Sequence, residues 1–220
     1  DIIRKQIPKN VKYEIFDCSK LKTLENNFNR ITQKLGCPDV FINCSYPRTS
    51  DWNQCSFNKI TLKRMTKNVE IHMNSYAWLA KAVAEKMVKN NVKGSIINLN
   101  SIYGLLGQDL TIYEKTSIKE NMPYSMIKGG LVNLTRQMAS YYGKFGIRVN
   151  DICSGGLKGH VAGTSNQQEK QFIKKYEKKV PLKRLGNPDE VANVITFISS
   201  DAASYITGSN ILVDGGWTVI

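Results

Sequence analysis

Short apolar runs alternate with longer amphipathic segments along this 220-residue chain, and this alternation is the feature that most constrains its fold. Runs with the composition of strands lie at 11–16, 40–42, 95–99, 147–152 and 210–213. Apolar residues spaced three and four apart predict helices over 21–35, about 61–90 and 124–143. A polar, Lys-rich helical segment covers about 166–179, and Pro188-Asp189-Glu190 opens a further helix that runs to about 199. Strands that alternate with helices form βαβ units. We therefore expect one α/β domain over residues 1–220, with a doubly wound parallel sheet covered by helices on both faces.

The charge balance is strongly basic, with 31 Lys plus Arg against 18 Asp plus Glu and a formal charge of +13. Such a balance brings nucleic-acid binding into consideration. The basic residues are nevertheless spread along the chain, with a local density at 167–184, and no recognition motif accompanies them. We therefore expect a solvated basic surface and no nucleic-acid partner. Part of the charge would suit an anionic nucleotide or sugar nucleotide.

The five cysteines form no C-x-x-C pair, and the chain has only two histidines. This usage predicts a reduced cytoplasmic protein with small buried thiols and no metal site. No apolar run approaches membrane-spanning length, and the first residues lack the apolar run of a signal peptide. We accordingly expect no membrane partner.

A tyrosine and a lysine lie four residues apart where the helix over 124–143 begins. Pro123 suits the first helical turn, and residues four apart share one helix face, so Tyr124 and Lys128 should project into the same space. A nearby cation lowers the pKa of a phenol from its usual value of about 10. The pair is therefore a candidate for acid/base catalysis on a hydroxyl or carbonyl. In a chain with ten tyrosines, one such spacing also arises readily by chance.

Further motifs follow the predicted strands and helices in a fixed order. They are Asp17 after a strand, Asn43-Cys44-Ser45, Asn74 in the long helix, and the stretches 97–101, 124–128, 147–150, 181–186 and 206–216. This ordered set resembles the short-chain dehydrogenase/reductase family over nearly all of the chain. The resemblance implies a Rossmann-type fold and a nicotinamide-dependent oxidoreductase that uses NAD, with NADP as the alternative.

The resemblance also implies roles for particular residues. Tyr124 would be the general acid/base, Ser101 would hydrogen-bond the reacting oxygen, and Lys128 would hold the nicotinamide ribose and lower the pKa of the phenol. Asn74 would position a water that relays protons to Lys128. The cofactor would contact Asp1, Asp17, Asn43, Cys44, Tyr124, Lys128, Gly155 and Leu157.

Structural alternatives exist for several of these residues. Ser101 could cap a turn, and Asn74 could bond to the helix backbone. Asp17 could cap a helix instead of lying beside the adenine, with Ser19 as another candidate cap for the helix over 21–35. Asn43 would act through its backbone geometry rather than through chemistry.

The chain departs from the family pattern at three places. Ser101 and Tyr124 are farther apart than usual, so the insert at about 108–122 is expected to wall the substrate site. Ser154-Gly155-Gly156 stands where the family has Pro-Gly, and Gly159 stands where a Thr often meets the cofactor carboxamide. The glycine-rich turn that receives the pyrophosphate is absent before Asp17.

This last departure predicts a sheet that lacks its first βα unit. The strands at 11–16 and 40–42 would correspond to the family's third and fourth, which two other strands separate. We therefore expect an N-terminally incomplete piece of a longer protein. Asp1 would then end the second strand, where an acidic side chain favours NAD over NADP.

The insert and the stretch 155–163 resemble the flagellin-modification oxidoreductases of nonulosonic-acid biosynthesis. This implies a nucleotide-linked sugar as the substrate, with Lys158, His160, Gln167 and Arg184 near its phosphate or hydroxyls. One alternative is a 3-oxoacyl-carrier-protein reductase, whose acidic carrier would suit the basic surface. Another is a non-catalytic subunit, because the glycine turn is absent. The helices over 61–90 and 124–143 are expected to build a homodimer or homotetramer.

Overall fold

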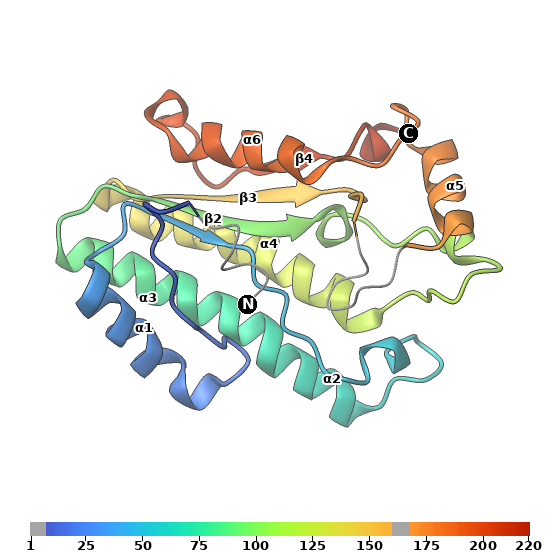
Figure 1. The fold of residues 1–220 in the computed structure, drawn as a ribbon, viewed down its shortest axis with the longest axis horizontal. Coiled ribbons are helices and arrows are strands. Elements are labelled where there is room, and N and C mark those ends of the chain that lie inside the picture. Colours follow the sequence, from blue (N-terminus) through green and yellow to red (C-terminus); the bar gives the residue numbers. More distant parts are fainter. Residues whose placement is uncertain (1–7, 160–167) are drawn as a thin grey trace.

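The computed structural model describes residues 8–159 and 168–220, which form a parallel sheet with helices on both faces (Figure 1). The sheet contains four strands in the order β1 (Val40–Asn43), β2 (Ser95–Ser101), β3 (Arg148–Ser154) and β4 (Asn210–Val213). The register pairs Val40 with Ser95 and continues so that Ser101 lies beside Ser154. All carboxyl ends therefore point the same way, and the expected Rossmann-type α/β class is confirmed.

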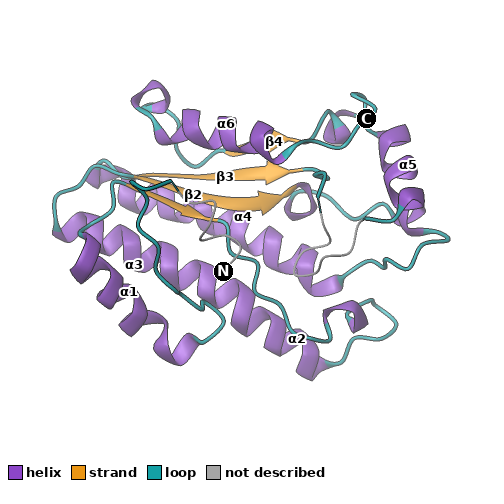
Figure 2. Ribbon diagram, in the orientation of Figure 1, coloured by secondary structure: helices purple, strands orange, loops and turns teal. Residues whose placement is uncertain are grey.

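The helices cover the sheet unequally (Figure 2). One face carries α1 (Leu21–Leu35), α3 (Ser75–Lys89) and α4 (Met122–Tyr142), and the other carries α6 (Pro188–Ser199). Helix α5 (Lys170–Lys179) lies beyond the carboxyl ends of the strands, at the right of Figure 1. Short 3₁₀ turns occupy Trp52–Gln54, Ile102–Gly104, Leu110–Tyr113, Gly143–Phe145, Asp201–Ala203 and Trp217–Val219.

Side-chain alternation along the strands divides the core between the two faces. Ile96 and Val149 pack against α3 and α4, where Val83, Met87 and Met138 complete a buried cluster. The neighbouring strand residues point the other way, and Ile97 and Ile152 pack against α6 through Val191 and Ile198. Strands that are buried on both faces need continuous apolar runs, which is why the sequence at 95–99 identifies a strand so clearly.

The predicted long helix at 61–90 is present, but it is not uniform. Thr61 caps α2 (Leu62–Asn68) by accepting a hydrogen bond from the Arg64 amide, and a π-helical segment, Val69–Asn74, joins α2 to α3. A π turn adds a residue to the repeat and so rotates the side chains that follow it around the helix axis. This change decides which residues face the site.

Two local predictions are wrong. Residues 11–16 form no strand, and Val11, Tyr13 and Ile15 are exposed. An extended run needs a hydrogen-bonding neighbour, and no strand of the described residues pairs with it or with the other edge of β1. Ser19 does not cap α1 either. Its hydroxyl donates to Asp17, and Lys20 holds the capping position without a side-chain bond.

Candidate active site

The candidate catalytic residues gather at the carboxyl edge of the sheet, at the right of Figure 1. Asn43 ends β1, Ser101 ends β2, and Ser154, next to Ser101 in the register, ends β3. Ligands of open parallel sheets bind at this edge. Helix α4 passes beneath it and supplies Tyr124 and Lys128 from its first two turns.

Tyr124 and Ser101 form the centre of the site. The Asn121 side chain caps α4 by accepting from the Tyr124 amide, so the phenol projects from the first turn. Burial raises the pKa of Tyr124, and a hydrogen bond with Ser101 opposes this shift. The Ser101 hydroxyl also accepts from the Tyr103 amide at 3.2 Å. Ser101 therefore caps the turn that follows β2 and also hydrogen-bonds the phenol of Tyr124. The turn-capping role and the proposed catalytic role of Ser101 are thus compatible.

Lys128 is 3% exposed and lies on the same helix face as Tyr124. Its Nζ donates to the Leu99 carbonyl at 3.0 Å and lies 5.1 Å from the Tyr76 ring centroid and 5.8 Å from that of Tyr124. Burial lowers the pKa of Lys128 to about 8, while Asp151 acts in the opposite direction. The expected downward shift of the Tyr124 pKa is not seen, because burial of the phenol dominates and raises it.

A buried polar network lies beneath Lys128, and the sequence analysis did not predict it. Asp151, on β3, is fully buried and accepts from Thr135 Oγ1 at 2.7 Å and from Asn100 Nδ2 at 2.9 Å. Asn100 also donates to the Lys128 carbonyl, and its Oδ1 accepts from the Ser101 amide. One amide side chain thus contacts the backbone of two candidate catalytic residues. Burial raises the pKa of Asp151 to about 6.

Three aromatic rings surround the Tyr124 ring. The centroids of Tyr46, Trp52 and Tyr103 lie 6.0, 6.2 and 6.4 Å from it, each in an edge-to-face arrangement. We call these three residues the aromatic wall. Tyr46 and Trp52 come from the segment after β1, to which the sequence analysis assigned no helix or strand. Only the aromatic content of that segment could have indicated a ligand surface.

Asn74 is not brought to the other three predicted catalytic residues. It is exposed at the end of the π-helical segment. His72, two residues earlier, is instead fully buried, and its ring lies 5.3 Å from the Tyr46 ring and 5.5 Å from the Tyr76 ring. Regular helical spacing could not predict that His72 would be buried and Asn74 exposed, because the π turn changes which side chains point inward.

The predicted cofactor-binding residues at the end of β1, Asn43 and Cys44, lie beside a cavity of about 390 Å³. Asn43 and Cys44 line it from the end of β1, and Phe16 and Cys18, which flank Asp17, line it from the segment before α1. The Asn43 Nδ2 atom is buried and has no hydrogen-bond partner among the described residues. Asp17 itself accepts from Ser19 at 2.6 Å and has an exposed ion pair with Lys20.

The loop after β3 places Gly155 and Leu157 near the same edge. Gly155 donates to the Val213 carbonyl, and a Cβ at Gly155 would lie 2.9 Å from the Asp214 Cα and the Tyr176 hydroxyl. Leu157 pairs with Gly186 in an isolated parallel bridge. Close backbone packing therefore explains why a glycine stands at 155.

The residues predicted to lie near the phosphate or hydroxyls of the substrate differ in where the structure places them. Arg184 is engaged by Glu190 in a two-point ion pair, with nitrogen–oxygen distances of 2.7 and 2.6 Å. Lys158 is exposed beside this pair. Asp1, His160 and Gln167 lie outside the described residues.

The predicted substrate wall is attached to the segment after β1 by hydrogen bonds. Asn121 Nδ2 donates to the Trp52 carbonyl at 3.0 Å, and the Asn121 amide donates to Gln108 Oε1 at 2.9 Å. The Met122 amide donates to the Cys55 carbonyl. Asn121 therefore joins the insert, the Trp52 segment and the start of α4 at one point.

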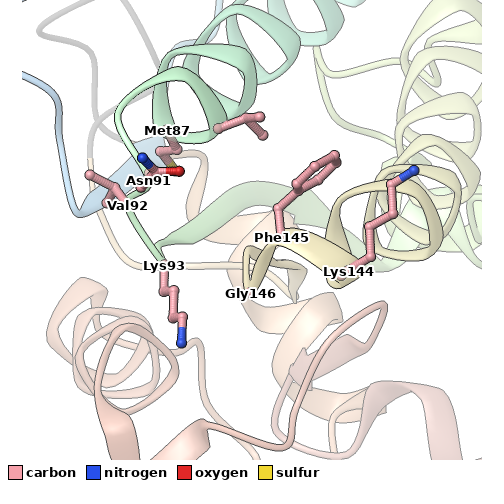
Figure 3. Close-up of a pocket in the computed structure, with 9 residues that line it drawn as sticks. Met87, Asn91, Val92, Lys93, Lys144, Phe145 and Gly146 are labelled. Carbon is pink, nitrogen blue, oxygen red and sulfur yellow. The ribbon is translucent and has the colours of Figure 1, made fainter.

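Another hollow, of about 470 Å³, lies at the far end of the sheet (Figure 3). Met87, the turn 91–93 and residues 143–146 line it, next to the amino ends of β2 and β3. The candidate catalytic side chains belong to the opposite edge, so this hollow is separate from the site.

The described residues contain no group of three or more His, Cys, Asp or Glu that could hold a metal ion. Within the same residues, no helix is long and apolar enough to cross a membrane.

Comparisons with known proteins agree with this fold. The family model described as enoyl-(acyl carrier protein) reductase matches residues 3–218. The chain therefore belongs to the short-chain dehydrogenase/reductases, a family of NAD(P)-dependent oxidoreductases.

Individual relatives cover most of the chain. Post-translational flagellin modification protein A from Campylobacter coli is 27% identical over 98% of this chain and 83% of the relative. Glucose 1-dehydrogenase 2 from Bacillus subtilis (strain 168) is 29% identical over 100% and 79%. Among solved structures, a short chain dehydrogenase from Leptospira borgpetersenii serovar Hardjo-bovis (strain JB197) with bound NAD⁺ is 30% identical, with a TM-score of 0.78 over 96% of this chain and 80% of that one.

Proposed function

We propose that this protein interconverts a hydroxyl and a carbonyl on a sugar or nucleotide-linked sugar that modifies flagellin or a surface glycan, with NAD as the cofactor. The observation that carries this proposal is the hydrogen bond between Ser101 and Tyr124, with Lys128 on the same helix face. The aromatic wall supports a ring-shaped substrate, because aromatic faces pack well against the apolar face of a sugar. The flagellin-modification relative supports the biological context.

Each residue has a definite role in this proposal. Tyr124 exchanges a proton with the substrate oxygen, and Ser101 donates a hydrogen bond to the same atom as negative charge develops on it. Lys128 contributes a positive charge and hydrogen bonds to the cofactor ribose. The cofactor, when bound, supplies or accepts the hydride.

The cofactor site extends from these residues toward β1. Asn43, Cys44 and Asp17 hold the adenosine side, and Gly155 and Leu157 border the nicotinamide side. The buried Asn43 Nδ2 without a partner fits this role, since such a donor is normally satisfied. Asp1 favours NAD in this proposal, and faster turnover with NADP would show that role to be wrong.

A panel of nucleotide sugars, free sugars and acyl thioesters, assayed for nicotinamide reduction or oxidation, tests the substrate class. We expect turnover with nucleotide-linked or free sugars. Turnover with an acyl thioester alone would favour the carrier-protein alternative, which the description of the matching family model and the net charge of +13 support.

A third possibility is a non-catalytic subunit of an oligomer. Fluorescence titration with NADH separates it from an enzyme, because a scaffold without cofactor affinity would give no change. The control is Tyr124→Phe, which keeps the ring and should still bind NADH while losing turnover. The cytoplasmic location is part of the same proposal, and fractionation of cells would test it.

A further inference from the structure

Asn100 is a buried amide to which the sequence gave no individual role. It precedes Ser101 at the end of β2 and is 3% exposed. Its Nδ2 donates to Asp151 Oδ2 at 2.9 Å and to the Lys128 carbonyl at 3.2 Å, and its Oδ1 accepts from the Ser101 amide at 2.9 Å. Because an amide nitrogen carries two hydrogens, both of its donors are used. Asn100 therefore connects β3 and α4 to the residue that ends β2.

Asp151 determines which way the Asn100 amide points. Burial raises the pKa of Asp151 to about 6, so the carboxylate is ionised at neutral pH and can only accept hydrogen bonds. Its other oxygen, Oδ1, accepts from Thr135 Oγ1 at 2.7 Å, which holds the carboxylate against α4. If the amide were reversed, its oxygen would face two acceptors, Asp151 and the Lys128 carbonyl. The amide thus has one orientation, with its oxygen toward the Ser101 amide.

The turn that follows Ser101 packs directly on α4 at the same place. A Cβ at Gly104 would lie 2.7 Å from the Lys128 carbonyl oxygen and 3.0 Å from Val132 Cγ2, so the two backbones are in close contact. Tyr124, whose phenol hydrogen-bonds Ser101, lies one helical turn before Lys128 on α4. A change in how the end of β2 rests on α4 would therefore move Ser101 relative to Tyr124. A displacement of about 1 Å in a catalytic site can lower the rate by about 100-fold.

We propose that Asn100 is a positioning residue that sets the spacing between the Ser101 hydroxyl and the Tyr124 phenol, with Asp151 as its fixed anchor. The inference rests on the proposed function of the site that contains Ser101 and Tyr124. Asn100 touches neither substrate nor cofactor in this role. It acts through the backbone of Ser101 and of Lys128, and it takes up no proton during the reaction.

Alanine substitution at two buried asparagines tests this role. Asn100→Ala should lower kcat by about 10–100-fold and change KM by less than about 2-fold, because alignment in the transition state is lost while binding contacts remain. Asn150→Ala is the matched control, since Asn150 on β3 is fully buried and also bonds two backbone groups, the Ile206 carbonyl and the Ser209 amide. Both variants should lose thermal stability, but only Asn100→Ala should lose kcat per folded molecule. An equal effect on kcat, or a wild-type kcat in Asn100→Ala, would overturn the proposal.

Substitutions of Asp151 separate orientation of the amide from the effect of charge. Asp151→Ala removes the anchor and should lower kcat about as much as Asn100→Ala does. Asp151→Asn keeps an oxygen that accepts from Asn100, so most of kcat should be retained. If Asp151→Asn lost as much kcat as Asp151→Ala, the carboxylate charge would be the important feature and the proposal would be wrong. Where the alanine variants do not fold, the kcat of folded Asp151→Asn decides by the same criterion.

Crystal structures of wild type and Asn100→Ala test the spacing without any turnover. In wild type, Ser101 Oγ and Tyr124 Oη should lie within about 3 Å of each other, and Asn100→Ala should lengthen this distance by about 1 Å. An unchanged distance would show that Asn100 does not set the spacing. Because the distance does not depend on a substrate, it decides the role of Asn100 even if the proposed reaction is not found.

Discussion

At the scale of single residues, the hydroxyl of Tyr124 is the atom on which the proposed chemistry depends. Tyr124→Phe removes the ionisable oxygen and keeps the ring that packs against the aromatic wall. We expect kcat to fall by about 10²–10⁴-fold with little change in the melting temperature. Steady-state kinetics and thermal unfolding check both outcomes. Tyr205→Phe, at a fully exposed tyrosine, is the control, and equal activity of Tyr124→Phe and wild type would exclude Tyr124 as the acid/base.

Asp151 should make the stability of the protein depend on pH. Burial raises its pKa in the folded state to about 6, from 3.8. Between these values the folded chain binds more protons than the unfolded chain, so the contribution of this group to stability falls as pH rises. Asp151→Asn removes this dependence and keeps the side-chain shape.

The measurement is thermal unfolding of both proteins across this range. The melting temperature of Asp151→Asn, relative to wild type, should rise between about pH 4 and about pH 7. A constant difference between Asp151→Asn and wild type would contradict the perturbed ionisation.

At the scale of elements, Asn121 determines how the connecting segments meet α4. It caps the helix through the Tyr124 amide and holds the Trp52 carbonyl through its Nδ2. Asn121→Ala should cost about 1 kcal/mol of stability through loss of the cap. Asn121→Ser keeps a capping hydroxyl but cannot reach Trp52, so it should raise KM several-fold near wild-type stability. Melting temperatures and kinetics of both variants separate the two roles, and an unchanged KM in both would show that Trp52 needs no such anchor.

At the scale of the whole molecule, the exposed apolar side chains of α3 and α4 predict a two-fold assembly. Trp78 is 46% exposed, Met126 41% and Tyr141 56%. Sedimentation velocity should detect a dimer or a tetramer, and Trp78→Glu should shift the population to smaller species. Phe57→Glu, at an exposed apolar residue outside these helices, is the control. A stable wild-type monomer at micromolar concentration would contradict the prediction.

The sequence alone determined those features that depend on local periodicity. The runs at 95–99 and 147–152 are strands because they are apolar enough to be buried between helices, and the shorter runs at 40–42 and 210–213 pair with them on either side of the sheet. Tyr124 and Lys128 share a face because α4 is a regular helix with a proline in its first turn. The family, the parallel sheet and the position of Ser101 at a strand end follow from the same patterns.

Only the tertiary structure decided the features that depend on distant neighbours. Residues 11–16 alternate like a strand, but hydrogen bonding to another chain segment, and not alternation, makes a strand. Asn74 matched a helical position, yet the π turn leaves it exposed and buries His72. The pKa values of Tyr124, Lys128 and Asp151 are set mainly by burial. Burial results from the packing of α4 on β2 and β3, which local residue order does not encode.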